Sequence, residues 1–387
     1  MSKWRKKQLQ EIAFLKPTET LKKGDIAPNI PMANIKEFQR DVVKIDYGEF
    51  RGGTKFRNGD TLLAKITPCL ENGKTAFVNC LQEDEIGFGS TEFIVLRAKE
   101  NIDERFLYYL SISPEFRKQA ISLMEGTSGR KRVNENALKI SDFLIPDFEE
   151  QRKIANILSA IDDKIQINNQ INHELEAMAK ALYDYWFMQF DFPDQNGKPY
   201  KSSGGKMVYH PELKREIPEG WGVEKLSHFL TIKNGKDHKH LQDGRFAVYG
   251  SGGIMRTVTD YLYSGESILF PRKGTLNNVM YVNEKFWTVD TMFYSEVNKS
   301  NSALYVFYSV KDIDFNKLNT GTGVPSMTSS ILYDLNIIVP KENILEKFNT
   351  VVKRNYETIK LNNIQNQELI QLRDWLLPML MNGQVKV

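Results

Sequence analysis

The chain has 387 residues, of which 41% are hydrophobic and 26% are charged. This length exceeds one ordinary hydrophobic core and suits two domains with connecting structure, and the composition argues against a disordered or fibrous protein. The net charge of +3 is too small to indicate a nucleic-acid partner by itself, so only local clusters of Lys and Arg can support such a partner.

Membrane-spanning and disulfide-stapled classes of protein are also disfavoured. No run approaches the roughly 18 apolar residues that cross a bilayer, and the first residues lead into no apolar signal core. The only cysteines, Cys69 and Cys80, cannot build a disulfide framework or a four-cysteine zinc site, and we expect both to be small core fillers. We therefore expect a cytoplasmic protein with no metal site and no membrane contact.

In chain order, turn formers and hydrophobic periodicity divide the sequence into five parts. Residues 1–146 and 221–340 alternate polar and apolar positions between turns, which predicts mixed domains with short strands and one or two helices each. Residues 147–190 and 341–387 have the periodicity of long helices. Residues 191–220 are rich in turn formers and lack periodicity, so we expect a connector there.

Apolar residues and a few asparagines recur every seven positions along both long helices. In the first helix they are Ile154, Ile161, Asn168, Leu175, Leu182 and, in a companion series, Leu158, Ile165, Asn172, Ala179, Trp186. In the second helix they are Phe348, Asn355, Asn362, Leu369, Leu376 and Val352, Ile359, Asn366, Arg373, Leu380. This spacing predicts an antiparallel coiled-coil pair, and the alternative is two ordinary core helices in separate domains.

The asparagines of this seam are the candidates for setting the register of the pair. Antiparallel pairing would place Asn168 opposite Asn366. It would likewise place Asn172 opposite Asn362. A buried polar layer of this kind fixes register at some cost in stability.

Local signals predict where the long helices begin and end. Asp147 with Glu150 resembles a capping box at a helix N-terminus, and so does Asn343 with Glu346. Pro378 is expected to end or kink the second helix.

The two halves of the chain are related by an internal duplication. Residues 129–182 align with residues 323–376 without a gap, which pairs Pro146 with Pro340. The beginnings of the halves match as well, since Trp4 and Leu9 are echoed by Trp221 and Leu226. We therefore expect an α+β protein in which two repeated mixed domains are separated by two long antiparallel coiled-coil helices, with pseudo-twofold symmetry.

Three segments carry a resemblance to a known family. They are Ile145-Pro146 leading into Glu149-Glu150-Gln151-Arg152-Lys153-Ile154-Ala155, then Leu158-Ser159-Ala160-Ile161-Asp162-Asp163-Lys164-Ile165, and Arg215-Glu216-Ile217-Pro218-Glu219-Gly220-Trp221 after the connector. These segments resemble the specificity subunits of type I restriction-modification enzymes, and the resemblance covers essentially the whole chain. The second helix departs from the family pattern, because Lys341-Glu342-Asn343-Ile344 replaces the usual Glu-Glu-Gln stretch.

The resemblance implies a DNA-recognition subunit that has no catalytic centre of its own. In that family two target-recognition domains, here residues 1–146 and 221–340, each read one half of an interrupted site in double-stranded DNA. The two helices hold these domains apart and bind two adenine-methylating subunits, and restriction subunits join that core. The resemblance thus places S-adenosylmethionine, ATP and magnesium on the partner subunits and no cofactor on this chain.

Motifs for catalysis are missing or badly placed. The chain has no Pro-Pro pair, which the flipped-adenine motif of DNA methyltransferases requires, and the glycine runs 87–89 and 249–253 indicate turns. Pro193-Asp194 followed by Glu212-Leu213-Lys214 fits a nuclease pattern but falls in the polar connector. No phosphate-binding loop for ATP exists. We therefore predict a protein that is not an enzyme; the alternatives are a single-chain DNA methyltransferase or nuclease, and a repeat scaffold that binds only protein.

Cations and polar residues near glycine turns are the candidate DNA contacts, because Lys and Arg bind phosphates and glycine lets the backbone approach DNA closely. In the first domain the candidates are Lys55, Arg57, Lys65, Thr67, Asn72, Lys74, Arg130, Lys131 and Arg132. In the second domain they are Lys236, Arg245, Arg256, Arg272, Lys273, Asn277, Asn278, Thr322 and Ser326. The sequence does not separate residues that read bases from residues that bind phosphates.

Overall fold

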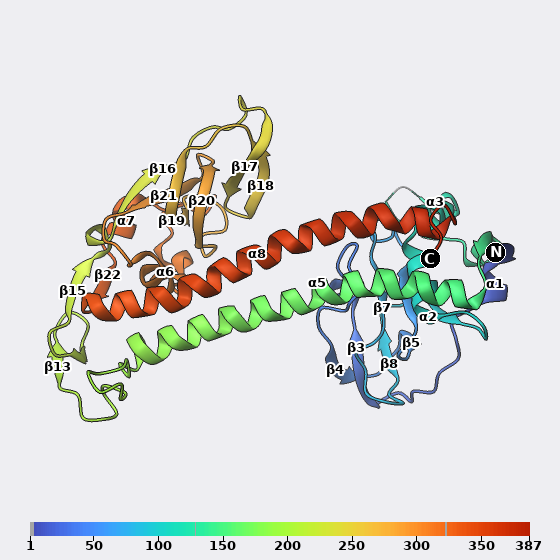
Figure 1. Cartoon of the computed structure of the whole chain (residues 1–387), viewed down its shortest axis with the longest axis horizontal. Helices are drawn as coiled ribbons and strands as arrows, with labels where there is room; N and C mark the ends of the chain where they lie inside the picture. The colour runs from blue at the N-terminus through green and yellow to red at the C-terminus, as the bar shows by residue number, and fades with distance from the viewer. Residues whose placement is uncertain (1–3, 128, 322) are drawn as a thin grey trace. The chain divides into compact units, whose positions relative to one another are not determined.

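The computed structural model describes residues 4–127, 129–321 and 323–387, which divide into two compact units (Figure 1). Unit 1 comprises the described residues up to Gln170 together with Asn362–Val387. Unit 2 comprises the described residues of Ile171–Leu361. Each unit contains one mixed α/β domain and a part of each long helix, as the internal duplication predicts.

Two four-stranded sheets form the mixed domain of unit 1. One has the order β2-β9-β6-β7, with β2 at Ala13–Leu15, β9 at Phe93–Ala98, β6 at Thr61–Ala64 and β7 at Thr75–Phe77. The other has the order β4-β3-β8-β5, with β4 at Asp46–Glu49, β3 at Ile26–Ile30, β8 at Gly87–Gly89 and β5 at Thr54–Phe56. All four residues of β6 are buried, which suits its place between two neighbouring strands.

Short helices and strand pairs complete unit 1. The helices are α1 at Leu9–Ile12, α2 at Glu104–Ile112, α3 at Pro114–Ser122 and α4 at Glu135–Lys139, with a 3-10 turn at Met32–Asn34. The strand β1, Arg5–Gln8, pairs antiparallel with β12, Asp142–Ile145, and β10, Met124–Glu125, pairs with β11, Arg132–Val133. The Asp103 carboxylate caps α2 by accepting from the backbone N–H groups of Arg105 and Phe106.

Unit 2 is built around one six-stranded sheet. Its order is β16-β21-β19-β20-β17-β18, with β16 at Leu230–Asn234, β21 at Met292–Val297, β19 at Tyr263–Pro271, β20 at Met280–Thr288, β17 at Asp243–Gly250 and β18 at Gly253–Val258. The strand β15, Gly222–Lys225, pairs antiparallel with β22, Asn336–Val339. The pairs β1–β12 and β15–β22 hold equivalent ends of the two repeats, which is structural evidence of the duplication.

Helices cover the sheet of unit 2, and the expected connector contains a small hairpin. The helices are α6 at Ala303–Lys311 and α7 at Ser329–Tyr333, with 3-10 turns at Leu226–His228 and Phe315–Leu318. Within residues 191–220, β13 at Met207–His210 pairs antiparallel with β14 at Arg215–Pro218. Local pairing of two four-residue strands leaves no long-range periodicity in the sequence.

The two long helices are α5, Phe148–Tyr183, and α8, Glu342–Met381, and a π-helical turn at Asp184–Met188 follows α5. The Asp147 carboxylate accepts the Glu150 N–H at 3.0 Å, in agreement with the first predicted cap. The second predicted cap is wrong, because α8 already begins at Glu342 and Asn343 lies inside it. Helix α8 also continues three residues past Pro378, to Met381, so this proline does not end it.

Helices α5 and α8 run antiparallel within each unit. In unit 1 the Arg373 guanidinium on α8 donates to Asp162 on α5, and the Asn168 amide donates to Asn366. In unit 2 the Asn355 amide donates to the Leu175 carbonyl at 3.4 Å. The mixed α/β class with repeated domains and two long helices is therefore as predicted from the sequence.

The asparagine layer lies in the seam between these helices. Asn168 is fully buried, and its amide nitrogen lies 2.8 Å from both Asn366 Oδ1 and Gln365 Oε1. The amide nitrogen of Asn366, also buried, lies 2.8 Å from Asn169 Oδ1. Asn172 is buried and Asn362 half-buried. The register role of Asn168, Asn172, Asn362 and Asn366 stays a prediction.

Replacing Asn168 alone with Leu should lower the free energy of unfolding by about 1–3 kcal/mol, because Asn366 loses a buried partner. The double variant Asn168→Leu/Asn366→Leu should recover most of that loss, since removal of both polar groups leaves a packed apolar pair. Urea unfolding of the two single variants, Asn168→Leu and Asn366→Leu, and of the double variant measures the effect, with the exposed Gln170→Leu as control. A double variant at least as destabilised as the sum of its single variants would contradict the pairing.

Candidate nucleic-acid interface

Two loops of unit 1 meet at a hydrogen-bonded junction that contains most of the candidate residues of the first domain. The segments are residues 65–74 and residues 129–133, and Ile66 forms an antiparallel bridge with Arg132. The Thr67 N–H donates to the Lys131 carbonyl at 3.0 Å. The Lys131 N–H donates to the Thr67 hydroxyl at 3.0 Å, and the Val133 N–H donates to the Lys65 carbonyl at 2.9 Å. We call this arrangement the unit 1 loop junction.

Glycine permits the turn that brings the second loop to this junction. Gly126 has φ +123° and Gly129 has φ +85°, in the region that side chains disfavour. A Cβ on Gly126 would lie 3.1 Å from the Arg130 carbonyl oxygen. Gly126 and Gly129 therefore allow the backbone to make the turn that brings residues 129–133 to the junction.

Acidic neighbours hold some of the junction's cations and leave others available. Arg132 makes a bidentate contact with Glu92, which lowers the pKa of that carboxyl, and Lys65 pairs with Glu135 at 3.2 Å. Arg130 and Lys131 are exposed, and no ion pair with either side chain is found among the described residues. These two cations are therefore exposed without an acidic partner among the described residues.

The unit 2 loop junction repeats this pattern with different side chains. Lys273 forms an antiparallel bridge with Ser326. The Gly274 N–H donates to the Pro325 carbonyl at 3.0 Å, and the Met327 N–H donates to the Arg272 carbonyl at 2.9 Å. In the ungapped repeat, residues 131–133 align with residues 325–327. Both backbone bonds thus have direct counterparts in unit 1.

Other candidates of the second domain surround this junction. The Arg272 guanidinium lies 5.9 Å from the centre of the Phe293 ring, whereas Lys273 is exposed. The Asn277 amide donates to Asp314 at 3.1 Å, and the Asn278 amide donates to the Ser251 carbonyl at 2.9 Å. Thr322 lies outside the described residues.

Of the remaining candidates in unit 1, Lys55 and Arg57 lie outside the loop junction, whereas Asn72 and Lys74 belong to its first segment. In unit 1, Lys55 donates to the Glu19 and Leu21 carbonyls, Arg57 pairs with Glu19, and Lys74 donates to the Met32 carbonyl. Asn72 is exposed on the turn within residues 65–74.

In unit 2 three further candidates lie along β17, β18 and the loop before them. Lys236 is exposed, and Arg245 lies 4.9 Å from the centre of the Phe246 ring. Arg256 donates to the Leu241 carbonyl and lies 3.5 Å from Asp243. Lys236 lies close to the junction, because the neighbouring Gly235 N–H donates to the Met292 carbonyl and the Arg272 N–H donates to the adjacent Thr291 carbonyl. Arg245 and Arg256 lie on β17 and β18.

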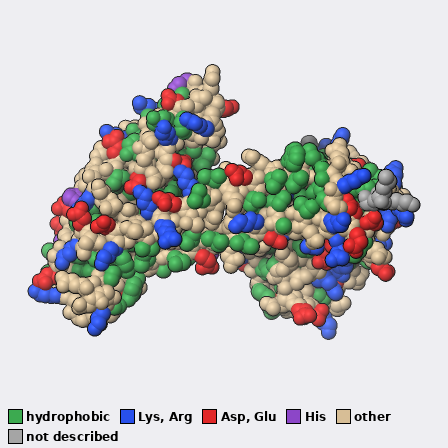
Figure 2. Space-filling view, viewed as in Figure 1, with side chains coloured by type: hydrophobic (Ala, Val, Ile, Leu, Met, Phe, Trp, Pro, Cys, Tyr) green, Lys and Arg blue, Asp and Glu red, His purple; other side chains and the backbone are tan. Residues whose placement is uncertain are grey.

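Basic and acidic side chains are mixed on the side of the molecule drawn in Figure 2. The acidic partners Glu19, Glu92 and Glu135 were not predicted from the sequence, since they lie far along the chain from the cations they hold. Several of the candidate cations are therefore paired within the domain itself.

The described residues contain no group of three or more His, Cys, Asp or Glu side chains that could hold a metal ion. Cys69 is partly buried and Cys80 is exposed, so the expectation that both fill the core is wrong for Cys80. Within the same residues, no helix is long and apolar enough to cross a membrane.

Comparison with known proteins gives consistent matches. The family model described as the type I restriction modification DNA specificity domain matches residues 1–177 and 218–371. The MjaIX specificity subunit of Methanocaldococcus jannaschii is 29% identical over 318 residues, which cover 75% of this chain and 71% of that protein. The HindI specificity subunit of Haemophilus influenzae is 24% identical over 405 residues, covering 85% and 87%.

A solved structure shares the fold. The S subunit of a type I restriction-modification system from M. genitalium has a TM-score of 0.60 at 17% identity, with 98% of this chain and 96% of that chain covered. The family description names DNA specificity, in agreement with the predicted recognition role without catalysis. The chain belongs to the family of type I restriction-modification DNA specificity subunits.

Proposed function

We propose that this chain reads a bipartite sequence in double-stranded DNA, one half with each recognition domain. The observation that carries the proposal is the duplicated loop junction, in which the same two backbone hydrogen bonds present different side chains in each unit. A DNA specificity subunit with one such junction in each unit would contact DNA at two places, which fits a target with two half-sites. Residues 1–146 and 221–340 are the proposed readers, residues 147–190 and 341–387 the proposed helical spacer, and residues 191–220 the connector.

The proposed DNA contacts are those predicted from the sequence. We order them by the exposure of each side chain and by whether it is held in an ion pair. Arg130, Lys131 and Lys273 are exposed at the junctions without an ion pair among the described residues, so they are the leading phosphate contacts. Arg132 is held by a carboxylate and Arg272 lies beside an aromatic ring, which restricts the directions in which they point. Restricted side chains suit the directional hydrogen bonds that read base edges.

In this proposal, methyl transfer and DNA cleavage are carried out by partner subunits. Two methyltransferase subunits bind the chain, restriction subunits join them, and the complex works in the cytoplasm where it meets cellular and phage DNA. S-adenosylmethionine, ATP and magnesium belong to those subunits, and this chain has no cofactor. Two experiments distinguish the alternatives. Methyl transfer or DNA cleavage by the purified chain would support a single-chain enzyme. Failure of the assembled complex to bind any DNA duplex would support a scaffold that binds only protein.

Replacing residues 1–146 with the first domain of another family member should change one half of the methylated sequence and leave the other half intact. Each junction lies inside a single unit, so exchange of one domain leaves the other junction unaltered. Mapping of methylated adenines across the genome, with the parent gene, the exchanged gene and neither, measures the result. A change in both halves at once would contradict two independent readers.

The double variant Arg130→Ala/Lys131→Ala should weaken DNA binding by the assembled complex for all sequences to a similar degree. If both cations contact phosphates, the slope of log K against log salt should become less steep by about 1.8, at roughly 0.9 per phosphate. Lys22→Ala/Lys23→Ala, which removes two adjacent exposed lysines of the same domain, is the charge-matched control. An equal change in slope for both double variants would exclude a specific role for the junction cations.

A further inference from the structure

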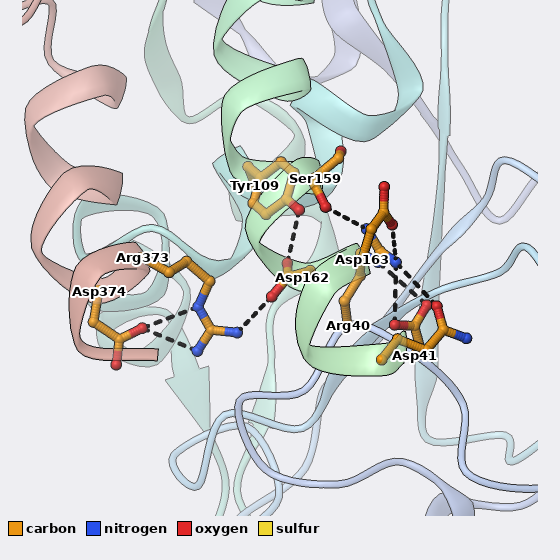
Figure 3. A network of polar contacts seen from close by, with 9 residues as sticks. Arg40, Asp41, Tyr109, Ser159, Asp162, Asp163, Arg373 and Asp374 are labelled. Carbon is orange, nitrogen blue, oxygen red and sulfur yellow. Dashed lines mark hydrogen bonds and ion pairs between the residues drawn. The ribbon is translucent and has the colours of Figure 1, made fainter. Parts of the chain in front are cut away.

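A buried polar cluster joins the first recognition domain to both long helices within unit 1 (Figure 3). The Tyr109 hydroxyl, on α2, donates to Asp162 Oδ2 at 2.7 Å. The Arg373 guanidinium, on α8, donates to Asp162 Oδ1 at 2.9 Å. The side chains of Arg373 and Asp162 are only 5% and 4% exposed. One carboxylate of α5 therefore receives directed bonds from the domain and from the second helix.

A second arginine extends the contact along α5. The Arg40 side chain, 5% exposed, lies 2.7 Å from Asp163 and 3.1 Å from Asp41, and it donates to the Ser159 carbonyl at 3.4 Å. Arg40 comes from the domain segment between the 3-10 turn at Met32–Asn34 and β4. We call Arg40, Tyr109, Asp162, Asp163 and Arg373 the Asp162 cluster.

Buried ion pairs of this kind fix geometry more than they add stability. Removal of two charges from water costs most of the energy that their attraction returns, so a packed apolar replacement is often as stable. The bonds nevertheless require particular positions of α2, α5 and α8, whereas an apolar contact tolerates small shifts. Burial, and then the neighbouring Asp162 carboxylate, raise the pKa of Tyr109, so its hydroxyl keeps its proton and remains a donor.

Unit 2 lacks this cluster at the matching place. The ungapped repeat aligns Asp162 with Tyr356 and Arg373 with Ala179. Both residues line a cavity of about 330 Å³, together with Tyr281, Phe307 and Tyr308. The ion pairs between α8 and the sheet of unit 2 are more exposed, with Lys353 and Lys360 each 38% exposed, and such pairs contribute little.

We propose that Asp162 and Arg373 are positioning residues, which with Tyr109 and Arg40 fix the orientation of the first recognition domain on the helix pair and so restrict the spacer between the DNA half-sites. The inference rests on the proposed bipartite reading. The domain of unit 2 is attached mainly through aromatic and aliphatic packing around its cavity. Polar contacts also attach the domain of unit 2, since the Tyr356 hydroxyl donates to the Tyr281 carbonyl at 3.4 Å, but the ion pair whose two side chains are at most 5% exposed lies in unit 1.

The test separates orientation from stability. The triple variant Tyr109→Phe/Asp162→Leu/Arg373→Met removes the central bonds and replaces them with apolar groups of similar size. It is assembled with the methyltransferase subunits and given duplexes with the mapped target, whose spacer is native, one base pair longer or one base pair shorter. The ratio of methylation rates between native and altered spacers should fall by about tenfold, equivalent to about 1.4 kcal/mol. This ratio is independent of the amount of folded complex.

Glu149→Gln/Arg152→Gln is the matched control, because it removes an ion pair of α5 whose side chains are 75% and 52% exposed. Its spacer ratio should equal that of the parent. The single variant Tyr109→Phe removes the bond from the domain to Asp162, retains the Asp162–Arg373 pair and leaves no buried charge unpaired, so it decides the question if the triple variant fails to assemble. Its spacer ratio should fall in the same direction by a smaller factor. An unchanged ratio in the assembled triple variant, or in the Tyr109→Phe variant where the triple does not assemble, would overturn the proposal. Absence of methylation by the parent complex on every duplex would instead overturn the proposed function.

Discussion

Neither mixed domain has a complete hydrophobic core until both long helices pack against it. In unit 1 the core around Phe106 and Phe116 is continuous with Ile154 and Leu158 of α5 and with Leu380 of α8. In unit 2 the core around Phe229 and Tyr305 likewise includes residues of both helices. The start of one helix and the end of the other therefore close each core. This requirement explains why unit 1 consists of two separate stretches of the chain.

The seam between the two long helices also contains buried polar groups. The free-energy cost of burying each group depends on whether it has a hydrogen-bonding partner there. Asn168 and Asp162 both lie on the buried face of α5, and each receives or donates bonds across the pair. A seam of purely apolar residues would allow neighbouring registers of nearly equal energy. Paired amides and an ion pair disfavour those registers, because a shifted helix would leave them buried without partners. The apolar residues of this interface thus stabilise the helix pair, and its paired polar residues restrict the pair to one register.

Much of this architecture could be predicted from the sequence, because it depends on patterns that repeat. Heptads and the ungapped repeat indicated two long helices and two mixed domains. Signals that depend on one position were less reliable: Asn343 lies within α8 and Pro378 does not end it. Proline removes only its own N–H bond, to the carbonyl four residues earlier, whereas its carbonyl still accepts, here from the Asn382 N–H at 3.1 Å, so the last turn can continue past it. The Glu92 and Glu135 partners of the junction cations arise only from tertiary folding and leave no local signal.

The loop junctions show how one backbone arrangement can present different side chains in the two units. Their defining bonds join backbone groups, from Thr67 to Lys131 in unit 1 and from Gly274 to Pro325 in unit 2. Backbone bonds impose little demand on side-chain identity, which is why Arg132 can correspond to Ser326 without loss of the bridge. The scaffold and the contacting side chains can therefore change independently. The repeat carries this arrangement twice, once in each unit, with the same two backbone bonds and different side chains.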